Sequence, residues 1–302
     1  MEKITIGIAA FNEEKVIGQS LESAIRSRPR AAQIIVVASG CTDNTEGVVR
    51  MFARRDSRIK LIVERERRGK GSAINQILRS AVGSYIVLTD ADLSFPANSV
   101  AELVAKFKPR TGAVSGRPEY FARTPMFSWW GRFASECASR QREKRAGKGY
   151  HAVSGYLYAI RKGIVRSIPT YAKSEDAFVG EIVRQKGFDI EYAPRAVVNV
   201  GYAENIQDYL TQKIRTHYGH LEVFRKAGAA NAYETARMAG GIRGEIGEYF
   251  KVARGKIASP ENYAYFCLYI LTEILVWTIA FMKFYLGGEE KWKQVRSTKV
   301  IS

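Results

Sequence analysis

The stretch that decides the fold is Tyr85-Ile-Val-Leu-Thr-Asp90-Ala-Asp92, where a run of β-forming residues ends in two carboxylates. A continuous apolar run of this kind is typical of a strand that is buried on both faces of an open α/β sheet. Ligands of such sheets bind beyond the carboxyl ends of the strands. Because i and i+2 side chains of an extended chain share one side, Asp90 and Asp92 are predicted to hold Mg²⁺ or Mn²⁺ carrying a diphosphate. The alternative is that both residues only cap the following helix.

Strands and helices alternate on the N-terminal side of this stretch and just beyond it. The apolar runs predict strands at residues 4–9, 33–38, 59–63 and 85–89, and the segments between and after them predict helices at 14–27, 45–54, 71–81 and 99–107. This alternation indicates βαβ units with right-handed crossovers. The predicted fold class is therefore α/β, with a Rossmann-like, mostly parallel sheet, helices on both faces and further helices at the C-terminal end.

The second half of the chain has longer helices and fewer strands. Helices are predicted at residues 126–146, 175–185, 206–227 and 233–253, and strands at 156–161, 189–192 and 196–200. The first residues, MEKITIGIAAFNEE, begin as a strand, and a signal peptide is not expected.

The composition indicates an anionic partner. Lys and Arg number 47 against 30 Asp and Glu, which gives a net charge of +17. Nucleic acid, phospholipid headgroups and phosphorylated ligands would all suit this charge. No RRM, KH or zinc-finger signature is present, so nucleic acid is not the expected partner. The three cysteines are far apart in the sequence, which argues against a disulfide framework or a cysteine-rich metal site.

Three further loops follow predicted strands and are expected at the same sheet edge as Asp90. The first is Ala10-Phe11-Asn12-Glu13-Glu14, which can cap a helix or bind a ligand hydroxyl. The second runs from Ser39 to Thr45, where Asp43 can accept a hydrogen bond from a nucleobase ring N–H or form an Asx turn. The third, Arg65 to Gly71, offers Lys70 to a phosphate between two glycines, without the spacing of a Walker A loop.

The four loops in this order resemble the inverting glycosyltransferases of family 2 with the GT-A fold. They stand here as AFNEE, ASGCTDNT, RGKG and LTDADLSF, and the resemblance covers about residues 3 to 200. It implies that a nucleotide-diphosphate sugar binds to these loops and that Asp90 and Asp92 hold the metal. The implied donor-binding residues are Ala10, Phe11, Asn12, Glu13, Ser39, Asp43, Lys70, Asp90, Ala91 and Asp92.

The same family likeness continues on the acceptor side. Val153–Arg161 is similar to the SGxxxAxR strand, which places Gly155 and Arg161 beside the acceptor or diphosphate. The pair Glu175-Asp176 is similar to the ED motif, so the resemblance implies that Asp176 is the general base and that Glu175 orients it. The alternative is that both acids only open the helix 175–185 and interact with its dipole.

A later segment matches part of a further motif, the QxxRW of processive members. Gln212 and Arg215 are retained, whereas Thr216 replaces the Trp. The resemblance implies that Arg215 binds the diphosphate leaving group. The missing Trp departs from the pattern for stacking of the acceptor or polymer.

Residues 263–286 form an apolar segment long enough to cross a bilayer, with Glu273 near its middle. A central acid costs about 2.5–3.5 kcal/mol on insertion scales. Three interpretations follow: a membrane span, a helix lying in the membrane plane, and a buried or homo-oligomer-forming helix. Basic residues flank the segment and would attract an anionic membrane surface: Lys251, Arg254, Lys256, Lys291, Lys293 and Arg296.

These observations favour an inverting glycosyltransferase similar to polyprenyl-phosphate sugar synthases and processive polysaccharide synthases. UDP and GDP donors both fit, and the expected acceptor is lipid-linked or a glycan. A sugar nucleotidyltransferase and a non-catalytic basic nucleic-acid-binding protein are the alternatives. The expected location is membrane-associated with a cytoplasmic catalytic domain. Three parts are predicted: a GT-A catalytic domain at 1–203, a helical acceptor-side extension at 204–258, and an apolar helix with a basic tail at 259–302.

Overall fold

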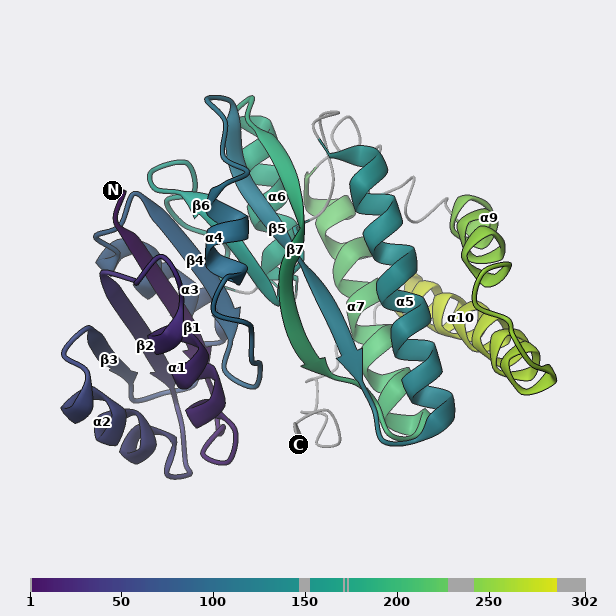
Figure 1. Ribbon diagram of the computed structural model, residues 1–302, viewed down its shortest axis with the longest axis horizontal. Helices are drawn as coiled ribbons and strands as arrows, with labels where there is room; N and C mark the ends of the chain where they lie inside the picture. The colour runs from purple at the N-terminus through teal and green to yellow at the C-terminus, as the bar shows by residue number, and fades with distance from the viewer. Residues whose placement is uncertain (1, 147–152, 171, 173, 228–241, 287–302) are drawn as a thin grey trace. The chain divides into compact units, whose positions relative to one another are not determined.

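The computed structural model describes residues 2–146, 153–170, 172, 174–227 and 242–286 (Figure 1). Its contacts separate two compact units. The first unit comprises Met1–Pro118 and Arg142–Val200, and the second comprises Glu119–Gln141 and Gly201–Val300. Residues 119–141, which the sequence prediction included in the first domain, thus belong to the second unit.

The first unit is built on a seven-stranded sheet in the order β3-β2-β1-β4-β6-β5-β7. Three pairings in its N-terminal part, β1 with β2, β1 with β4 and β2 with β3, are parallel, whereas β6 is antiparallel to both β4 and β5. The bounds are β1 Ile4–Ala10, β2 Gln33–Ser39, β3 Ile59–Glu64, β4 Tyr85–Asp90, β5 Thr111–Phe121, β6 Leu157–Arg161 and β7 Asp189–Gly201. The predicted α/β class with a mostly parallel sheet is confirmed.

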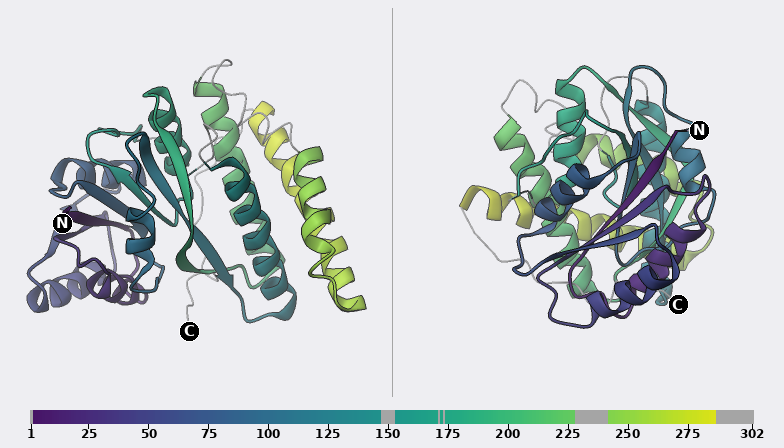
Figure 2. Two further views of the ribbon diagram at one scale, coloured as in Figure 1. Left: turned by 45° about the horizontal axis from the view of Figure 1, so that its top comes forward. Right: turned by 90° about the vertical axis from the view of Figure 1, so that its left-hand side faces the viewer.

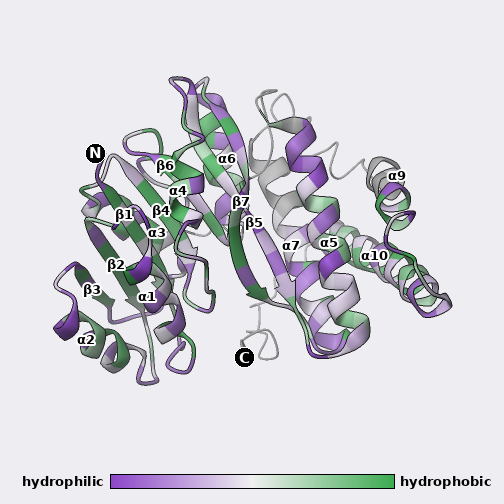
Figure 3. Ribbon diagram, viewed as in Figure 1, coloured by the Kyte–Doolittle hydropathy of each residue, from purple (hydrophilic) through white to green (hydrophobic). Residues whose placement is uncertain are grey.

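The central strands are buried on both faces, as their continuous apolar runs predict. Figure 3 shows the hydropathy of each residue along the strands. Side chains of β1 alternate between the two faces. A Cβ at Gly7 would lie 2.4 Å from the Ile77 side chain, so this face packs tightly on α3 (Lys70–Ser80). Ile6 and Ile8 point to the other face and are also fully buried.

The remaining helices of this unit are short. They are α1 Ile17–Arg26, α2 Thr45–Arg55, α4 Ser99–Val104 and α6 Glu175–Gln185. Figure 2 shows the helices and strands of this unit in two further views.

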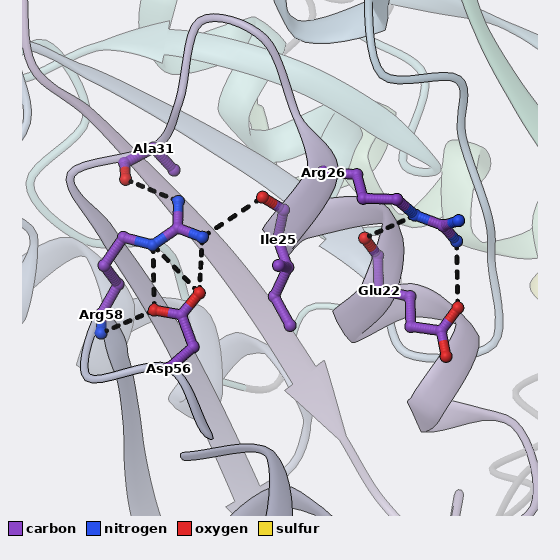
Figure 4. Close-up of polar contacts among 6 residues, drawn as sticks. All are labelled: Glu22, Ile25, Arg26, Ala31, Asp56 and Arg58. Carbon is purple, nitrogen blue, oxygen red and sulfur yellow. Dashed lines mark hydrogen bonds and ion pairs between the residues drawn. The ribbon is translucent and has the colours of Figure 1, made fainter. Parts of the chain in front are cut away.

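Arg58 fixes the turn between α2 and β3 (Figure 4). Its guanidinium donates to the carbonyl oxygens of Ala31 at 3.1 Å and Ile25 at 3.2 Å, and it pairs with Asp56 at 2.5 Å. The hydrogen bond from Arg58 lowers the pKa of Asp56. This basic residue therefore has a structural role, joining the chain before β3 to the end of α1.

Two strands differ from the sequence prediction. β5 was not predicted because its glycines and Pro118 obscure the apolar pattern, yet a Cβ at Gly116 would lie 2.8 Å from the Ala196 oxygen. Glycine is therefore needed there so that the backbones can approach closely. β7 was predicted as two strands on either side of Pro194, but it is continuous. As the last strand in the order it is an edge strand, where proline is tolerated.

The second unit is helical. Its helices are α5 Pro125–Arg145, α7 Ile206–Ala227, α9 Ile242–Ala253 and α10 Pro260–Leu286. An aromatic cluster forms its core. Trp130 in this cluster is 1% exposed, and its indole N–H donates to the backbone carbonyl oxygen of Tyr265 at 2.8 Å. α5 and α7 lie side by side in Figures 1 and 2. In the described part of the chain, α10 alone has the length and apolar character of a membrane span, with a mean hydropathy of 1.8 over its most apolar window.

Candidate active site

The loops that follow β1, β2, β3 and β4 meet at one edge of the sheet. The strand register pairs Ala10 with Ala38, Ala9 with Asp90, and Ser39 with Glu64. The last residues of the four parallel strands are therefore level with one another, and the side chains just beyond them are brought together as the sequence predicts.

Asn12 joins the first loop to the second. Its φ of 54° lies in the left-handed region, which asparagine tolerates better than most residues. The side-chain oxygen of Asn12 accepts from the Thr42 N–H at 2.8 Å, and its amide donates to the Thr42 hydroxyl at 3.1 Å. Next to it, the Glu13 N–H donates to the Thr45 hydroxyl oxygen at 2.8 Å, and the Glu13 side chain is buried. The AFNEE segment thus holds the second loop in place.

Asp43 forms the Asx turn that the sequence allows. Its Oδ1 accepts from the Thr45 N–H at 3.0 Å and from the Thr45 hydroxyl at 2.5 Å, while Oδ2 accepts from the Glu14 N–H at 3.1 Å. Burial raises the pKa of Asp43, but these donors outweigh it and the net pKa is lowered. Asp43 is therefore an ionised carboxylate held rigidly at the sheet edge.

The third loop folds over the first two. The Arg67 guanidinium lies 3.9 Å from the centroid of the Phe11 ring, a cation–π contact. Gly40 has a φ of 65°, and a Cβ there would lie 2.4 Å from the backbone nitrogen of Arg67. The Ser39 hydroxyl oxygen accepts from the Arg68 N–H at 3.2 Å. Sequence reasoning missed Arg67, because only the fold brings the third loop onto Phe11.

Lys70 and Asp90 form one ion pair, although the sequence assigned them separately to phosphate and metal. Lys70 is the first residue of α3, and its Nζ lies 2.5 Å from Asp90 Oδ1. Burial lowers the pKa of Lys70, but the charges of Asp90 and Glu175 outweigh it and hold the pKa above its ordinary value. The lysine is therefore a permanent cation between the DxD segment and the acids of α6.

The glycines on either side of Lys70 lie close to the protein backbone. The sequence attributed them to close approach of a phosphate. A Cβ at Gly71 would instead lie 2.7 Å from the Pro169 oxygen, and one at Gly69, where φ is 87°, would lie 3.5 Å from the Thr170 oxygen. The segment that leads to α6 therefore packs directly on this loop, and Gly71 makes room for protein backbone.

Glu175 and Asp176 are the first two residues of α6, and the charge of Glu175 raises the pKa of Lys70. Asp176 Oδ1 accepts from the Ala177 N–H at 2.9 Å. A Cβ at Gly155 would lie 3.0 Å from Asp176 Oδ2, so glycine leaves this carboxylate oxygen uncovered. Burial raises the pKa of Glu175, against the lowering effect of Lys70. The predicted residues Glu175, Asp176 and Gly155 are thus brought together with Lys70 and Asp90.

Tyr158 is a site residue that the sequence did not single out. It is 2% exposed and lies in β6, within the motif that carries Gly155. Burial raises the pKa of its phenol, and Lys70 opposes the rise while Asp176, Glu175 and Asp90 add to it. A small cavity of about 10 Å³ is lined in part by Lys70, Asp90, Gly155 and Tyr158. The Tyr158 side chain is therefore a neutral phenol that lies among Lys70, Asp90, Glu175 and Asp176.

Arg161 does not reach this site, which corrects the sequence assignment. It pairs in register with Tyr85, the first residue of β4, whereas Asp90 is the last. At about 3.3 Å per residue, the two ends of β4 are roughly 16 Å apart. The Arg161 guanidinium donates to the carbonyl oxygens of Thr111 and Lys108 at 3.2 and 2.8 Å. Its role is to close the opposite edge of the sheet.

Gln212 and Arg215 lie on α7 in the second unit, where Arg215 is exposed and Gln212 is half-buried. Their assignment to the diphosphate or acceptor stays a prediction.

The residues at the end of β4 suit a divalent cation that is shared with a ligand. Among the described residues, no group of three or more His, Cys, Asp or Glu side chains could hold a metal by itself. Asp90 is engaged by Lys70, and half-buried Asp92 follows two residues later. Mg²⁺ is commonly bound through one or two carboxylates together with substrate phosphates. The donor set fits a metal that enters with a diphosphate.

Asn75 couples α3 to the segment that precedes the acids of α6. Its amide donates to the Ile168 oxygen at 2.8 Å, and its side-chain oxygen accepts from the Ile168 N–H at 2.8 Å. All four groups are buried, and each unpaired buried group costs about 1–3 kcal/mol. The Asn75→Ala variant is therefore expected to lose about 2–4 kcal/mol of unfolding free energy in urea denaturation.

The matched control is Asn98→Ala, because Asn98 precedes α4 without a capping side-chain hydrogen bond. This variant is expected to change stability by less than about 0.5 kcal/mol. Equal destabilisation of the two variants would contradict the role of Asn75 as a clamp.

Comparison with known proteins places this geometry in a family. The model of the family "Glycosyl transferase family 2" matches residues 5–169. The poly-beta-1,6-N-acetyl-D-glucosamine synthase of Staphylococcus aureus (strain COL) is 25% identical over 230 residues, which are 74% of this chain and 56% of that protein. The synthase of Staphylococcus epidermidis is 24% identical over the same shares. The chain thus spans little more than half the length of these curated relatives.

A solved structure shows the same architecture. It is a mannosyltransferase from Pyrobaculum calidifontis in complex with GDP-Man and Mn²⁺, with a TM-score of 0.67 and 20% identity. The match covers 95% of this chain and 88% of that one, which supports a GT-A-like fold followed by C-terminal helices. Because the family model covers more than half of the sequence, this protein belongs to glycosyl transferase family 2.

Proposed function

We propose that this protein transfers a sugar, with inversion, from a nucleoside-diphosphate donor to an acceptor hydroxyl or phosphate. The observation that carries the proposal is the convergence of Lys70, Asp90, Glu175 and Asp176 at the edge where four strand ends meet. One permanent cation lies among three acids, so the site can hold an anionic leaving group on one side and accept a proton on the other.

In this proposal, some residues bind the nucleoside diphosphate and others act on the acceptor. A divalent cation, when bound at Asp92, would neutralise charge on the diphosphate. Asp43 and the AFNEE segment would orient the nucleoside, and Lys70 would place positive charge beside the leaving group. The uncovered oxygen of Asp176, beside Gly155, would accept the proton of the acceptor hydroxyl as it attacks the anomeric carbon. Glu175 and the Tyr158 hydroxyl would keep Asp176 and Lys70 in position.

The acceptor is expected to be a glycan or a lipid-linked sugar at a membrane. Two matched relatives carry the name of a poly-beta-1,6-N-acetyl-D-glucosamine synthase, and α10 contains an apolar stretch long enough to cross a membrane. The net charge of +17 favours approach to an anionic membrane surface. The catalytic unit would then face the cytoplasm, where nucleotide sugars are supplied. A homo-oligomer through α10 is the competing arrangement.

The donor is tested by thermal stabilisation with a panel of UDP- and GDP-sugars, each with and without Mn²⁺ or Mg²⁺. A donor at a hundred times its Kd is expected to stabilise the native state by about 2.7 kcal/mol. The rise in Tm should require the metal and be confined to one nucleoside. If no nucleotide sugar raises the Tm with either metal, the proposed donor class is wrong.

A further inference from the structure

α10 has two different faces along its full length. One face is buried in the second unit and includes Phe266, Tyr269, Glu273, Val276 and Trp277. The opposite face is apolar and exposed. Its exposed apolar residues are three, four or seven positions apart, so they form one stripe along the helix: Leu268, Leu271, Leu275, Met282 and Leu286. Leu271 is 64% exposed and Met282 56%.

The single acid of the apolar segment is held by α7. The Tyr209 hydroxyl donates to Glu273, and Lys213 Nζ and His217 Nε2 lie 3.9 and 3.7 Å from its carboxylate oxygens. The three α7 residues are four apart, so they share one face of that helix. The Trp277 ring lies against the His217 ring, with centroids 4.2 Å apart. Glu273 therefore ties α10 to α7 through a buried polar network.

This tie argues against a span formed by α10. A helix that crosses the bilayer on its own would separate Glu273 from all three partners and leave its charge in hydrocarbon. Taking α7 along would bring its acidic and basic residues into the bilayer: Asp208, Lys213, Arg215, His217, His220, Glu222, Arg225 and Lys226. Neither arrangement satisfies the polar groups. The helix pair fits a position at the membrane–water boundary, with the stripe toward lipid.

The surroundings of the stripe carry the charge and the aromatic residues of a membrane-surface helix. Lys251 is exposed in the last turn of α9, and Arg254 and Lys256 are exposed between α9 and the start of α10. Phe250 is 53% exposed, and its ring centroid lies 5.4 Å from that of Phe266. The sequence after α10 adds Lys291, Lys293 and Arg296. An apolar stripe with basic flanks is typical of helices that lie in the plane of an anionic bilayer.

We propose that α10 is a monotopic membrane anchor, whose Leu268–Leu286 stripe lies in the surface of an anionic bilayer while Glu273 keeps the helix docked on α7. The basic flanks favour lipid over a second copy of the chain, because a two-fold pairing of the stripes would bring like charges together. The inference concerns binding only, so it stands apart from sugar transfer.

The test is flotation of the full chain with vesicles, without nucleotide sugar. Vesicles of phosphatidylcholine mixed with phosphatidylglycerol should carry the protein upward, and alkaline carbonate should release it. The Leu271→Glu/Leu275→Glu variant is expected to reduce the bound fraction at least about tenfold. The matched control Met51→Glu/Val82→Glu changes two exposed apolar residues of the first unit and should float like the unaltered chain. Circular dichroism checks that each variant is folded before its flotation is compared.

Three outcomes would overturn the proposal. The first is an unaltered chain that does not float with anionic vesicles. The second is protein that stays with the vesicles after carbonate treatment, as a true span would. In the third, Leu271→Glu/Leu275→Glu leaves flotation unchanged but converts an oligomer to a monomer in light scattering, which would assign the stripe to a second copy. Because none of these measurements uses a donor, failure here leaves the proposed sugar transfer to be judged by its own test.

Discussion

The Asp176→Asn variant is expected to transfer sugar roughly 10²–10⁴ times more slowly than the unaltered protein, the range found for loss of a general base. The amide has nearly the same shape as the carboxylate, but it cannot accept the proton of the acceptor hydroxyl. Gly155 would still leave the side chain uncovered, so access to the site is unchanged. The measurement is transfer from the labelled donor identified by thermal stabilisation to an extracted glycolipid and glycan pool.

Two comparisons make the result specific to the base. Donor binding, read as the metal-dependent rise in Tm, should persist in Asp176→Asn, because this residue faces the acceptor in the proposed mechanism. Asp189→Asn is the matched control, since Asp189 starts β7 and lies 3.7 Å from Arg110. Its transfer rate should stay within about twofold of the unaltered protein. A wild-type rate for Asp176→Asn would remove Asp176 from the role of base.

The Asp92→Ala variant is expected to lose both the metal-dependent stabilisation by donor and at least about a hundredfold in transfer rate. The reason is that Asp92 follows the C-terminal end of β4, where the proposed mechanism places a cation shared with the diphosphate. Loss of that cation leaves the charge on the departing diphosphate without its main counter-charge. Thermal stabilisation by donor with Mn²⁺, followed by transfer at saturating donor, measures the two effects.

Glu22→Ala provides the comparison for Asp92→Ala. Glu22 forms an exposed pair with Arg26 at 2.9 Å on α1, and such pairs contribute about 0.3–0.5 kcal/mol. This variant should keep the full metal-dependent rise in Tm. If Asp92→Ala also kept it, the cation would have to be held elsewhere, and the assignment of the DxD segment would fail.

Local sequence predicted the parallel half of the sheet, because each of its strands is a continuous apolar run bounded by turn residues. Prediction of strands from continuous apolar runs failed for β5. There, Gly112 and Gly116 make room for neighbouring atoms, and Pro118 interrupts the apolar pattern. A strand whose glycines are required by its neighbours has too weak an apolar pattern to be recognised alone. β7 was divided for a related reason, since an edge position makes Pro194 acceptable.

The site was predictable at the level of which loops meet, and less so at the level of contacts. Lys70 and Asp90 are twenty positions apart in the sequence, and only the fold shows that they form an ion pair. Arg161 shares a motif with Gly155, but Arg161 pairs with Tyr85 at the start of β4, whereas Gly155 precedes β6, whose first residue pairs with Thr89 near the end of β4. A motif gives the order of residues along a strand and not which of them face the ligand. Tyr158 was overlooked because a buried tyrosine in a strand carries no distinctive local signal.

The contact between the RGKG turn and residues 168–170 has a consequence for engineering. Gly71 contacts the Pro169–Thr170 backbone, and Asn75 forms two hydrogen bonds with Ile168. The loop that carries Lys70 and the segment that leads to Asp176 are therefore expected to move together. A chimera that imports only the turn from a related protein would therefore displace Asp176 as well. Exchange of specificity in this scaffold requires both pieces to be transplanted as a unit.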